Sequence, residues 1–241
     1  MTSLPEEDIL GILSTGKISF KGQFLWGSNY TFLVNVLRKG QNVPAVYKPS
    51  QGERPLWDFP PGSLATREVA AFVASQWLSW DLVPPTVLCR DGPAGGGSLQ
   101  FFVEVDPERH YFTFSDEEKQ RLRPTALFDL LVNNADRKGG HILLAADGHV
   151  WLIDHGVCFH SEDKLRTVVW DFAGETIPSA LLKDVERFRN ALQEPGDFRN
   201  RLTSLLAPEE TRALVWRSDR LLESRIFPGP GPGRPFPWPL V

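Results

Sequence analysis

Residues able to support phosphate chemistry are concentrated between positions 133 and 156, in the stretch NNADRKGGHILLAADGHVWLIDHG. Asp136 follows a helical pattern and precedes RKGG, so it should lie on a loop that glycines allow to approach a cleft. His141 stands at the start of one apolar run, and Asp154 stands at the end of the next. The turn ADGH between the runs predicts a hairpin, which would bring His141 and Asp154 to the same end.

An imidazole and a carboxylate side by side can bind a divalent cation. A second carboxylate on the neighbouring loop can orient or deprotonate an attacking hydroxyl. This combination meets the needs of phosphoryl transfer, in which catalysis comes from positioning and charge neutralisation. Taken singly, Asp136 and Asp154 are equally compatible with structural turns. Their predicted convergence at one site is what favours chemistry.

Bulk composition narrows the class of protein. The chain has 241 residues and a net charge of −4, which argues against a nucleic-acid binder and an anionic membrane surface. Its two cysteines, Cys89 and Cys158, match no metal-ligand spacing. The first residues lack the pattern of a signal peptide, and no apolar stretch approaches the roughly 20 residues of a membrane span. We therefore expect a cytoplasmic protein that binds no nucleic acid and has no stable membrane insertion.

The first half of the sequence is typical of strands with one long helix. A short helix should begin near Pro5 and end before Gly16. Alternating apolar and polar residues predict antiparallel strands in KISFKGQFLWGSNYTFLVNVL and VPAVYKPS. Ser63 is placed to cap the helix SLATREVAAFVASQWL, and LVPPTVLCRDGPAGGGSLQFFVEV predicts two further strands.

The second half is mainly helical. Ser115 and Glu118 have the spacing of a capping box, and Pro124 should divide the helix that they begin. Three amphipathic helices are predicted in SALLKDVERFRNALQ, DFRNRLTSLL and APEETRALVWRSDRLLESR. The Pro/Gly-rich end, PGPGPGRPFPWPLV, should be extended or disordered.

These patterns predict an α+β protein with two lobes and a cleft between them. The expected boundaries are a β-rich N-lobe at 1–104, a mainly helical C-lobe at 105–228 and a tail at 229–241.

The stretch DRKGGHILL…WLIDHG resembles the catalytic loop and metal motif of the protein-kinase-like superfamily. The closest branch is the phosphatidylinositol 3-/4-kinases, and within it a family of similar bacterial proteins. These enzymes carry D-R-H/x-x-x-N and then, past a hairpin, D-F-G or D-N-G. The resemblance covers residues from about Lys17 to Phe172 and implies a two-lobed protein-kinase-like fold.

The resemblance also implies an ATP site in the first half. Lys48, in AVYKPS, would neutralise the α- and β-phosphates, with Glu68 as its ion-pair partner. The segment KGQFLWGSN would form the loop over the phosphates, where Ser28 could donate to them, although it is not a strict G-x-G-x-x-G. Backbone groups near Val103 would contact the adenine.

In the second half, the resemblance makes Asp136 the catalytic carboxylate and Lys138 the contact of the γ-phosphate. Asp154 would bind Mg²⁺ or Mn²⁺ together with His141. The family has asparagine at the position of His141, and imidazole suits Mn²⁺ better than the hard Mg²⁺. Phosphotransfer is therefore expected to be weak, manganese-dependent or absent.

The acceptor is the least defined element. Lys164 and Arg166 are the only cations in the segment that follows IDHG, which argues against a phosphoinositide. The segment is also too short for control by activation-loop phosphorylation. We expect an ATP-dependent phosphotransferase acting on a protein or small-molecule hydroxyl. The alternatives are a nucleotide-binding pseudokinase or scaffold, and a transferase of AMP.

Overall fold

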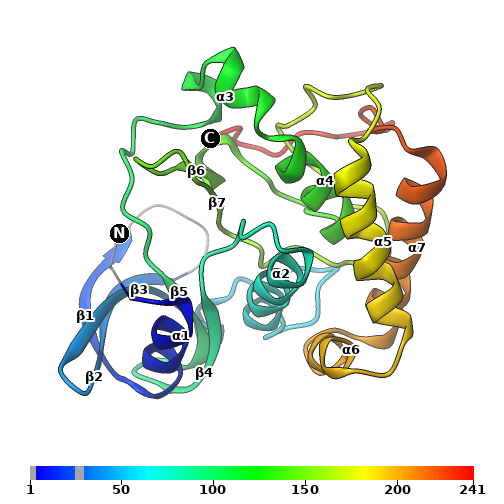
Figure 1. Cartoon of the computed structure of the whole chain (residues 1–241). Helices are drawn as coiled ribbons and strands as arrows, with labels where there is room; N and C mark the ends of the chain where they lie inside the picture. Colours follow the sequence, from blue (N-terminus) through cyan, green and yellow to red (C-terminus); the bar gives the residue numbers. More distant parts are fainter. Residues whose placement is uncertain (1–3, 25–29) are drawn as a thin grey trace.

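A five-stranded antiparallel sheet occupies the first part of the chain, in the order β1-β2-β3-β5-β4 (Figure 1). The structure is a computed structural model that describes residues 4–24 and 30–241. Its strands are β1 (Lys17–Phe24), β2 (Thr31–Arg38), β3 (Gln41–Pro49), β4 (Thr86–Gly92) and β5 (Gly95–Phe101). The strands predicted from alternation are therefore present, and β5 inserts between β3 and β4.

Helix α1 (Glu6–Thr15) covers one face of this sheet, as Figure 1 shows. It begins after Pro5 and ends at Gly16, as predicted. The core beneath it consists of Ile9, Ile12, Leu13, Val34, Val36, Val43, Ala45, Tyr47 and Leu99. Because side chains alternate along a strand, the burial of Tyr47 under α1 directs Lys48 to the opposite face.

Helix α2 (Leu64–Leu78) lies between β3 and β4 in sequence, but most of its buried apolar residues belong to the core of the helical part. Arg67 connects α2 to the helical part. Its Nη1 donates to the carbonyl of Cys158 at 2.6 Å, and its Nη2 pairs with Glu210. Trp77 stacks on Phe198 with ring centroids 4.5 Å apart. The predicted N-cap Ser63 precedes the helix, but its hydroxyl donates to the carbonyl of Pro60 and caps no helical N–H group.

The helical part begins with α3 (Asp116–Gln120) and α4 (Arg123–Val132). The Ser115–Glu118 capping box is formed, and Pro124 lies in the first turn of α4, so both predictions are confirmed. The short hairpin β6 (Ile142–Leu144) and β7 (Val150–Leu152) follows. The three predicted helices are α5 (Ser179–Gln193), α6 (Asp197–Thr203) and α7 (Pro208–Ser224).

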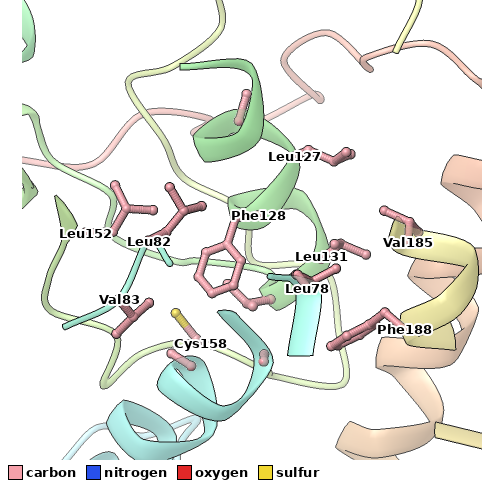
Figure 2. Packing of buried hydrophobic residues seen from close by; sticks show 14 of the residues in the cluster. Leu78, Leu82, Val83, Leu127, Phe128, Leu131, Leu152, Cys158, Val185 and Phe188 are labelled. Carbon is pink, nitrogen blue, oxygen red and sulfur yellow. The ribbon is translucent and has the colours of Figure 1, made fainter. Parts of the chain in front are cut away.

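The core of the helical part gathers side chains from α2, α4, α5 and β7 (Figure 2). Leu78, Phe128, Leu152 and Phe188 meet there, each with 1% of its surface exposed or less. Burying such side chains contributes about 1.5–3 kcal/mol each. This packing fixes α4 and β7, from which the loops carrying Asp136 and Asp154 emerge.

The segment after α7 is extended and runs back over the helical part (Figure 1). The carbonyl of Pro235 accepts from the backbone N–H of Thr167, and that of Leu240 accepts from Gly139 at 2.7 Å. Within the described residues, no helix combines the length and apolar character that crossing a membrane requires.

Candidate active site

The loop that carries Asp136 is held by the asparagines that end α4. Asn133 takes a left-handed conformation (φ 53°) and terminates the helix. The side chain of Asn134 accepts from the backbone N–H of Asp136 at 2.9 Å and donates to Asp129 at 3.2 Å. Asparagine suits both positions, because it tolerates left-handed backbone and can bond its own chain two residues on.

Arg137 is the buried centre of this loop, with no side-chain surface exposed. Its Nε donates to both carboxylate oxygens of Asp129 at 3.1 Å. Its Nη1 donates to the carbonyl of Ile153 at 2.8 Å, and its Nη2 lies 2.7 Å from Nε2 of His155. Arginine only donates, so His155 accepts through Nε2 and is neutral. One guanidinium thus ties α4, the Asp136 loop and the segment around Asp154 together.

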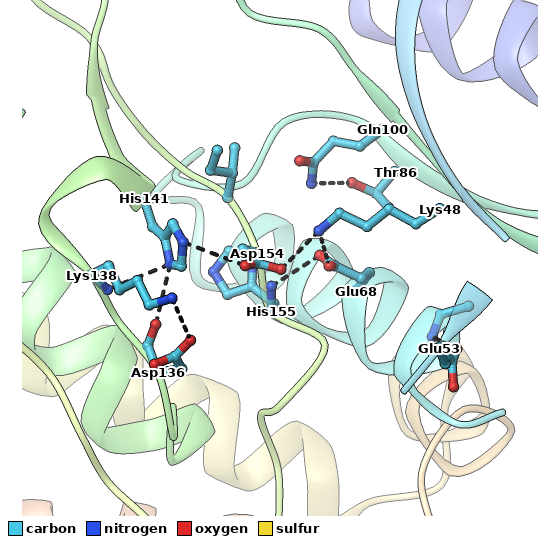
Figure 3. A network of polar contacts seen from close by, with 12 residues as sticks. Lys48, Glu53, Glu68, Thr86, Gln100, Asp136, Lys138, His141, Asp154 and His155 are labelled. Atoms are coloured by element: carbon cyan, nitrogen blue, oxygen red, sulfur yellow. Dashed lines mark hydrogen bonds and ion pairs between the residues drawn. The ribbon is translucent and has the colours of Figure 1, made fainter. Parts of the chain in front are cut away.

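Lys48, Glu68 and Asp154 meet on the sheet side of the site (Figure 3). The ammonium of Lys48 contacts Oε1 of Glu68 at 2.5 Å and Oδ1 of Asp154 at 2.9 Å. The other oxygen of Glu68 accepts from the backbone N–H of His155 at 3.0 Å. β3, α2 and the turn after β7 are therefore joined through one carboxylate.

The opposite charges of Lys48, Glu68 and Asp154 stabilise the ionised forms of these side chains. Burial lowers the pKa of Lys48, but the charges of Asp154 and Glu68 outweigh burial and raise it overall. The Lys48 ammonium in turn holds the pKa of Asp154 well below its usual range. Asp154 has left-handed backbone (φ 62°), and its side chain is 49% exposed. Its carboxylate is thus ionised and accessible.

His141 faces the second oxygen of Asp154. Its Nε2 lies 3.4 Å from Oδ2, so the hairpin brings the two side chains together as the spacing predicts. Nδ1 lies 3.1 Å from the carbonyl of Asp136, which can only accept, so the proton belongs on Nδ1. The longer 3.4 Å approach of the Lys138 N–H to Nδ1 requires the other tautomer and is the weaker contact. Burial lowers the pKa of His141 to about 4, so the ring is neutral at pH 7.

A lone pair of His141 therefore faces a carboxylate oxygen of Asp154. This donor set, a neutral imidazole and an ionised carboxylate, fits a divalent cation. No group of three or more His, Cys, Asp or Glu side chains gathers in this way among residues 4–24 and 30–241. A cation here would complete its coordination with oxygens of a nucleotide and water, as Mg²⁺ commonly does.

Asp136 and Lys138 lie on the other side of His141 (Figure 3). Nζ of Lys138 is 3.3 Å from Oδ2 of Asp136. Burial raises the pKa of Asp136, and the charge of Lys138 acts against this rise. A carboxylate in this setting can accept a proton more readily than one in water.

Six of the eight residues predicted for the site are thus gathered in one network: Lys48, Glu68, Asp136, Lys138, His141 and Asp154. Val103 follows β5 in the segment that leads from the sheet part to the helical part. Among the described residues, its backbone N–H and carbonyl have no backbone hydrogen-bond partner. Ser28 lies outside the described residues.

The sequence reasoning missed the residues that support the site. Asp129 was a detectable signal, because it places a carboxylate within the apolar run ALFDLLV of a helix. Arg137, adjacent to Asp136, was its natural partner. Thr86 and Gln100 were also missed: both are buried, and Nε2 of Gln100 donates to Thr86 at 2.9 Å beside Lys48 (Figure 3). A polar residue in a strand does not by itself indicate that the residue lies beside Lys48.

Comparisons with known proteins show similarity in sequence and in fold. Residues 65–208 match the family model described as phosphatidylinositol 3- and 4-kinase. Protein Rv2133c of Mycobacterium tuberculosis is 40% identical over an alignment of 268 positions, which covers 97% of this chain and 95% of that protein. Phosphatidylinositol 4-kinase gamma 4 of Oryza sativa subsp. japonica is 35% identical over 130 residues, covering 45% of this chain and 22% of that protein.

The crystal structure of the Helicobacter pylori proinflammatory kinase CtkA has a similar fold, with a TM-score of 0.53 and 13% sequence identity. The likeness covers 89% of this chain and 94% of that one. It confirms the predicted α+β, kinase-like fold.

Proposed function

Because the chain belongs to the phosphatidylinositol 3- and 4-kinase family, we propose that it is an ATP-dependent phosphotransferase acting on a protein or small-molecule hydroxyl. The observation that carries this proposal is the joined network of Lys48, Glu68 and Asp154, with Asp136 beyond His141. A cytoplasmic location, where ATP is abundant, accords with this activity.

Each side chain has a role that its contacts support. Lys48 binds the α- and β-phosphates, oriented by Glu68, and backbone groups near Val103 bind the adenine. Asp136 orients the acceptor hydroxyl and takes its proton, for which its raised pKa is suited. Lys138 contacts the γ-phosphate. Phosphoryl transfer asks for such positioning and charge neutralisation rather than covalent chemistry.

His141 and Asp154 would hold Mg²⁺ or Mn²⁺ through Nε2 and Oδ2, the two atoms that face each other. When bound, the ion neutralises charge on the phosphates. The chain's own contribution is to keep both ligands ready: Asp154 ionised by Lys48, and His141 neutral and oriented by the carbonyl of Asp136.

The direct test compares wild-type protein with Lys48→Met, using ATP labelled on either the γ- or the α-phosphate. We expect γ-label on an acceptor or on the protein itself, reduced at least about 100-fold in Lys48→Met because the phosphates lose their charged contact. Lys183→Met, which replaces an exposed lysine of α5, is the matched control and should behave as wild type. Transfer that survives in Lys48→Met would contradict the assigned site. Label carried only from the α-phosphate would indicate AMP transfer instead.

His141 itself favours a second candidate, a nucleotide-binding pseudokinase, because an imidazole replaces the asparagine expected at this position. A rise in melting temperature with ATP, without any release or transfer of phosphate, would support that alternative.

Replacing His141 with asparagine should keep or raise the Mg²⁺-dependent rate and lower the ratio of the Mn²⁺ rate to the Mg²⁺ rate. An amide oxygen is a harder ligand than an imidazole nitrogen and suits Mg²⁺ better. Initial rates of γ-label transfer with each ion measure this ratio. If His141→Asn instead loses metal binding altogether, histidine is the required ligand and the expectation is wrong.

A further inference from the structure

A pocket of about 790 Å³ lies beyond the Asp136 loop, and nothing in the proposed reaction has used it. Segments far apart in the sequence form it: the end of α4, residues 161–170, helix α7 and residues 226–235. Its size is that of a small-molecule site. Four arginines line it: Arg166, Arg217, Arg220 and Arg234.

None of these arginines has an ion-pair partner within the described residues. Arg220 lies over the ring of Trp216 at 5.0 Å, which orients the guanidinium without neutralising it. Lys164 also lines the pocket, but it is paired with Asp58 and Glu162. The four guanidiniums therefore give this pocket a positive field in a chain whose net charge is −4, and such a field attracts anions.

Arg217 is the most informative of the four. Its Nε donates to the carbonyl of Leu131 at 2.7 Å, and its Nη1 donates to that of His160 at 3.2 Å. Its Nη2 is buried and has no hydrogen-bond partner in the described chain. A buried donor without a partner costs about 1–3 kcal/mol, more when it is charged. Arg217 therefore brings to the pocket wall a positive charge that no described carboxylate pairs with.

The pocket adjoins the proposed catalytic loop. The backbone N–H of Arg166 donates to the carbonyl of Asn134 at 2.8 Å, and the carbonyl of Arg166 accepts from Arg137 at 2.9 Å. Asn134 and Arg137 flank Asp136 by two residues and one residue in the sequence. The charge of Arg166 reaches the carboxylate of Asp136 and acts to lower its pKa. The wall of the pocket at Arg166 is therefore bonded through its backbone to the residues on both sides of Asp136.

The lining is not uniformly basic. Asp163 also contributes, with its Oδ1 accepting from the backbone N–H of Leu165 at 3.3 Å. Trp170 and Trp216 supply flat apolar walls. The combination fits a ligand that carries both a doubly charged anionic group and a ring or apolar portion.

We propose that this pocket binds the phosphate group of a phosphate-bearing acceptor, and so holds its hydroxyl for Asp136. The inference rests on the proposed phosphotransferase function. It also adds cations that the segment after IDHG lacks by itself, because α7 contributes Arg217 and Arg220 and the tail contributes Arg234.

Binding of phenyl phosphate, measured by titration calorimetry without nucleotide, tests the pocket independently of catalysis. We expect wild-type protein to bind it, and the variant with both Arg220→Gln and Arg234→Gln to bind at least about tenfold more weakly, because two charged contacts are lost. Both arginines are exposed, so the variant should fold. Arg212→Gln, an exposed arginine of α7 outside the pocket, is the matched control.

Lys48→Met provides a second control, since it weakens binding only if phenyl phosphate occupies the nucleotide site. Equal affinity of the double variant and wild type for phenyl phosphate, or no measurable binding by wild type, would contradict the proposal that this pocket binds phosphate.

Sedimentation with phosphatidylcholine vesicles, with and without phosphatidic acid, distinguishes a lipid headgroup from a soluble phosphate as the ligand. Vesicle binding that requires both phosphatidic acid and the two arginines would support a lipid headgroup. If the protein binds phenyl phosphate but transfers no γ-label in the ATP experiment, the pocket is a phosphate-binding site and the proposed phosphotransferase activity is wrong.

Discussion

Asp154→Asn should lower the rate of γ-phosphate transfer at saturating ATP by about 1,000-fold, the upper end of the loss when one preorganised charge contact is removed. Both oxygens of this carboxylate are in use: Oδ1 contacts Lys48 at 2.9 Å, and Oδ2 faces His141 at 3.4 Å. Asparagine keeps the size of the side chain but removes its charge. A divalent cation would then meet two neutral protein ligands, an amide oxygen and an imidazole, and no negative charge from the protein.

Asp147→Asn is the matched control, because Asp147 belongs to the turn of the same hairpin and is exposed. It should transfer phosphate at the wild-type rate. Melting temperatures of both variants establish that the comparison is between folded proteins. A rate for Asp154→Asn within tenfold of wild type would remove this residue from the proposed machinery.

The second large effect concerns stability. Arg137→Leu should lower the free energy of unfolding by about 3–5 kcal/mol, because it leaves the buried carboxylate of Asp129 without its cation. The substitution also removes the hydrogen bonds that Arg137 donates to the carbonyl of Ile153 and to Nε2 of His155. Urea unfolding followed by tryptophan fluorescence measures the change.

Arg201→Leu, an exposed substitution in α6, should change the free energy of unfolding by less than about 0.5 kcal/mol. The double variant Arg137→Leu and Asp129→Leu should lose less than the sum of the single losses, because it leaves no unpaired buried charge. Additive losses would mean that the two side chains stabilise the fold independently of each other.

The local features of this fold could be predicted because short-range patterns determine them. Alternation in VPAVYKPS identified β3, and the turn at Asp147 identified the hairpin that joins His141 to Asp154. Residues close in sequence share a loop or a strand pair, so their spacing constrains where they meet.

Contacts between distant segments were beyond these patterns. Nothing in the spacing of β3 and β5 predicts that Lys48 pairs with Ser98 across the sheet. The domain boundary expected at residue 104 follows chain order, whereas α2 shares its core with helices that come after that position. The same limit concealed the arginine pocket, since Arg166 and Arg234 are brought together only by the return of the chain after α7.

The anchoring of α2 has a consequence for control. In kinases, activity is often governed by whether the helix that bears the glutamate is in place. Here, swinging Glu68 away from Lys48 would break the buried pair of Arg67 with Glu210, at a cost of about 3–5 kcal/mol. A state so unfavourable is populated at less than about 1%. If the chain is the phosphotransferase proposed above, its rate would therefore depend on the supply of nucleotide and acceptor rather than on a movement of α2.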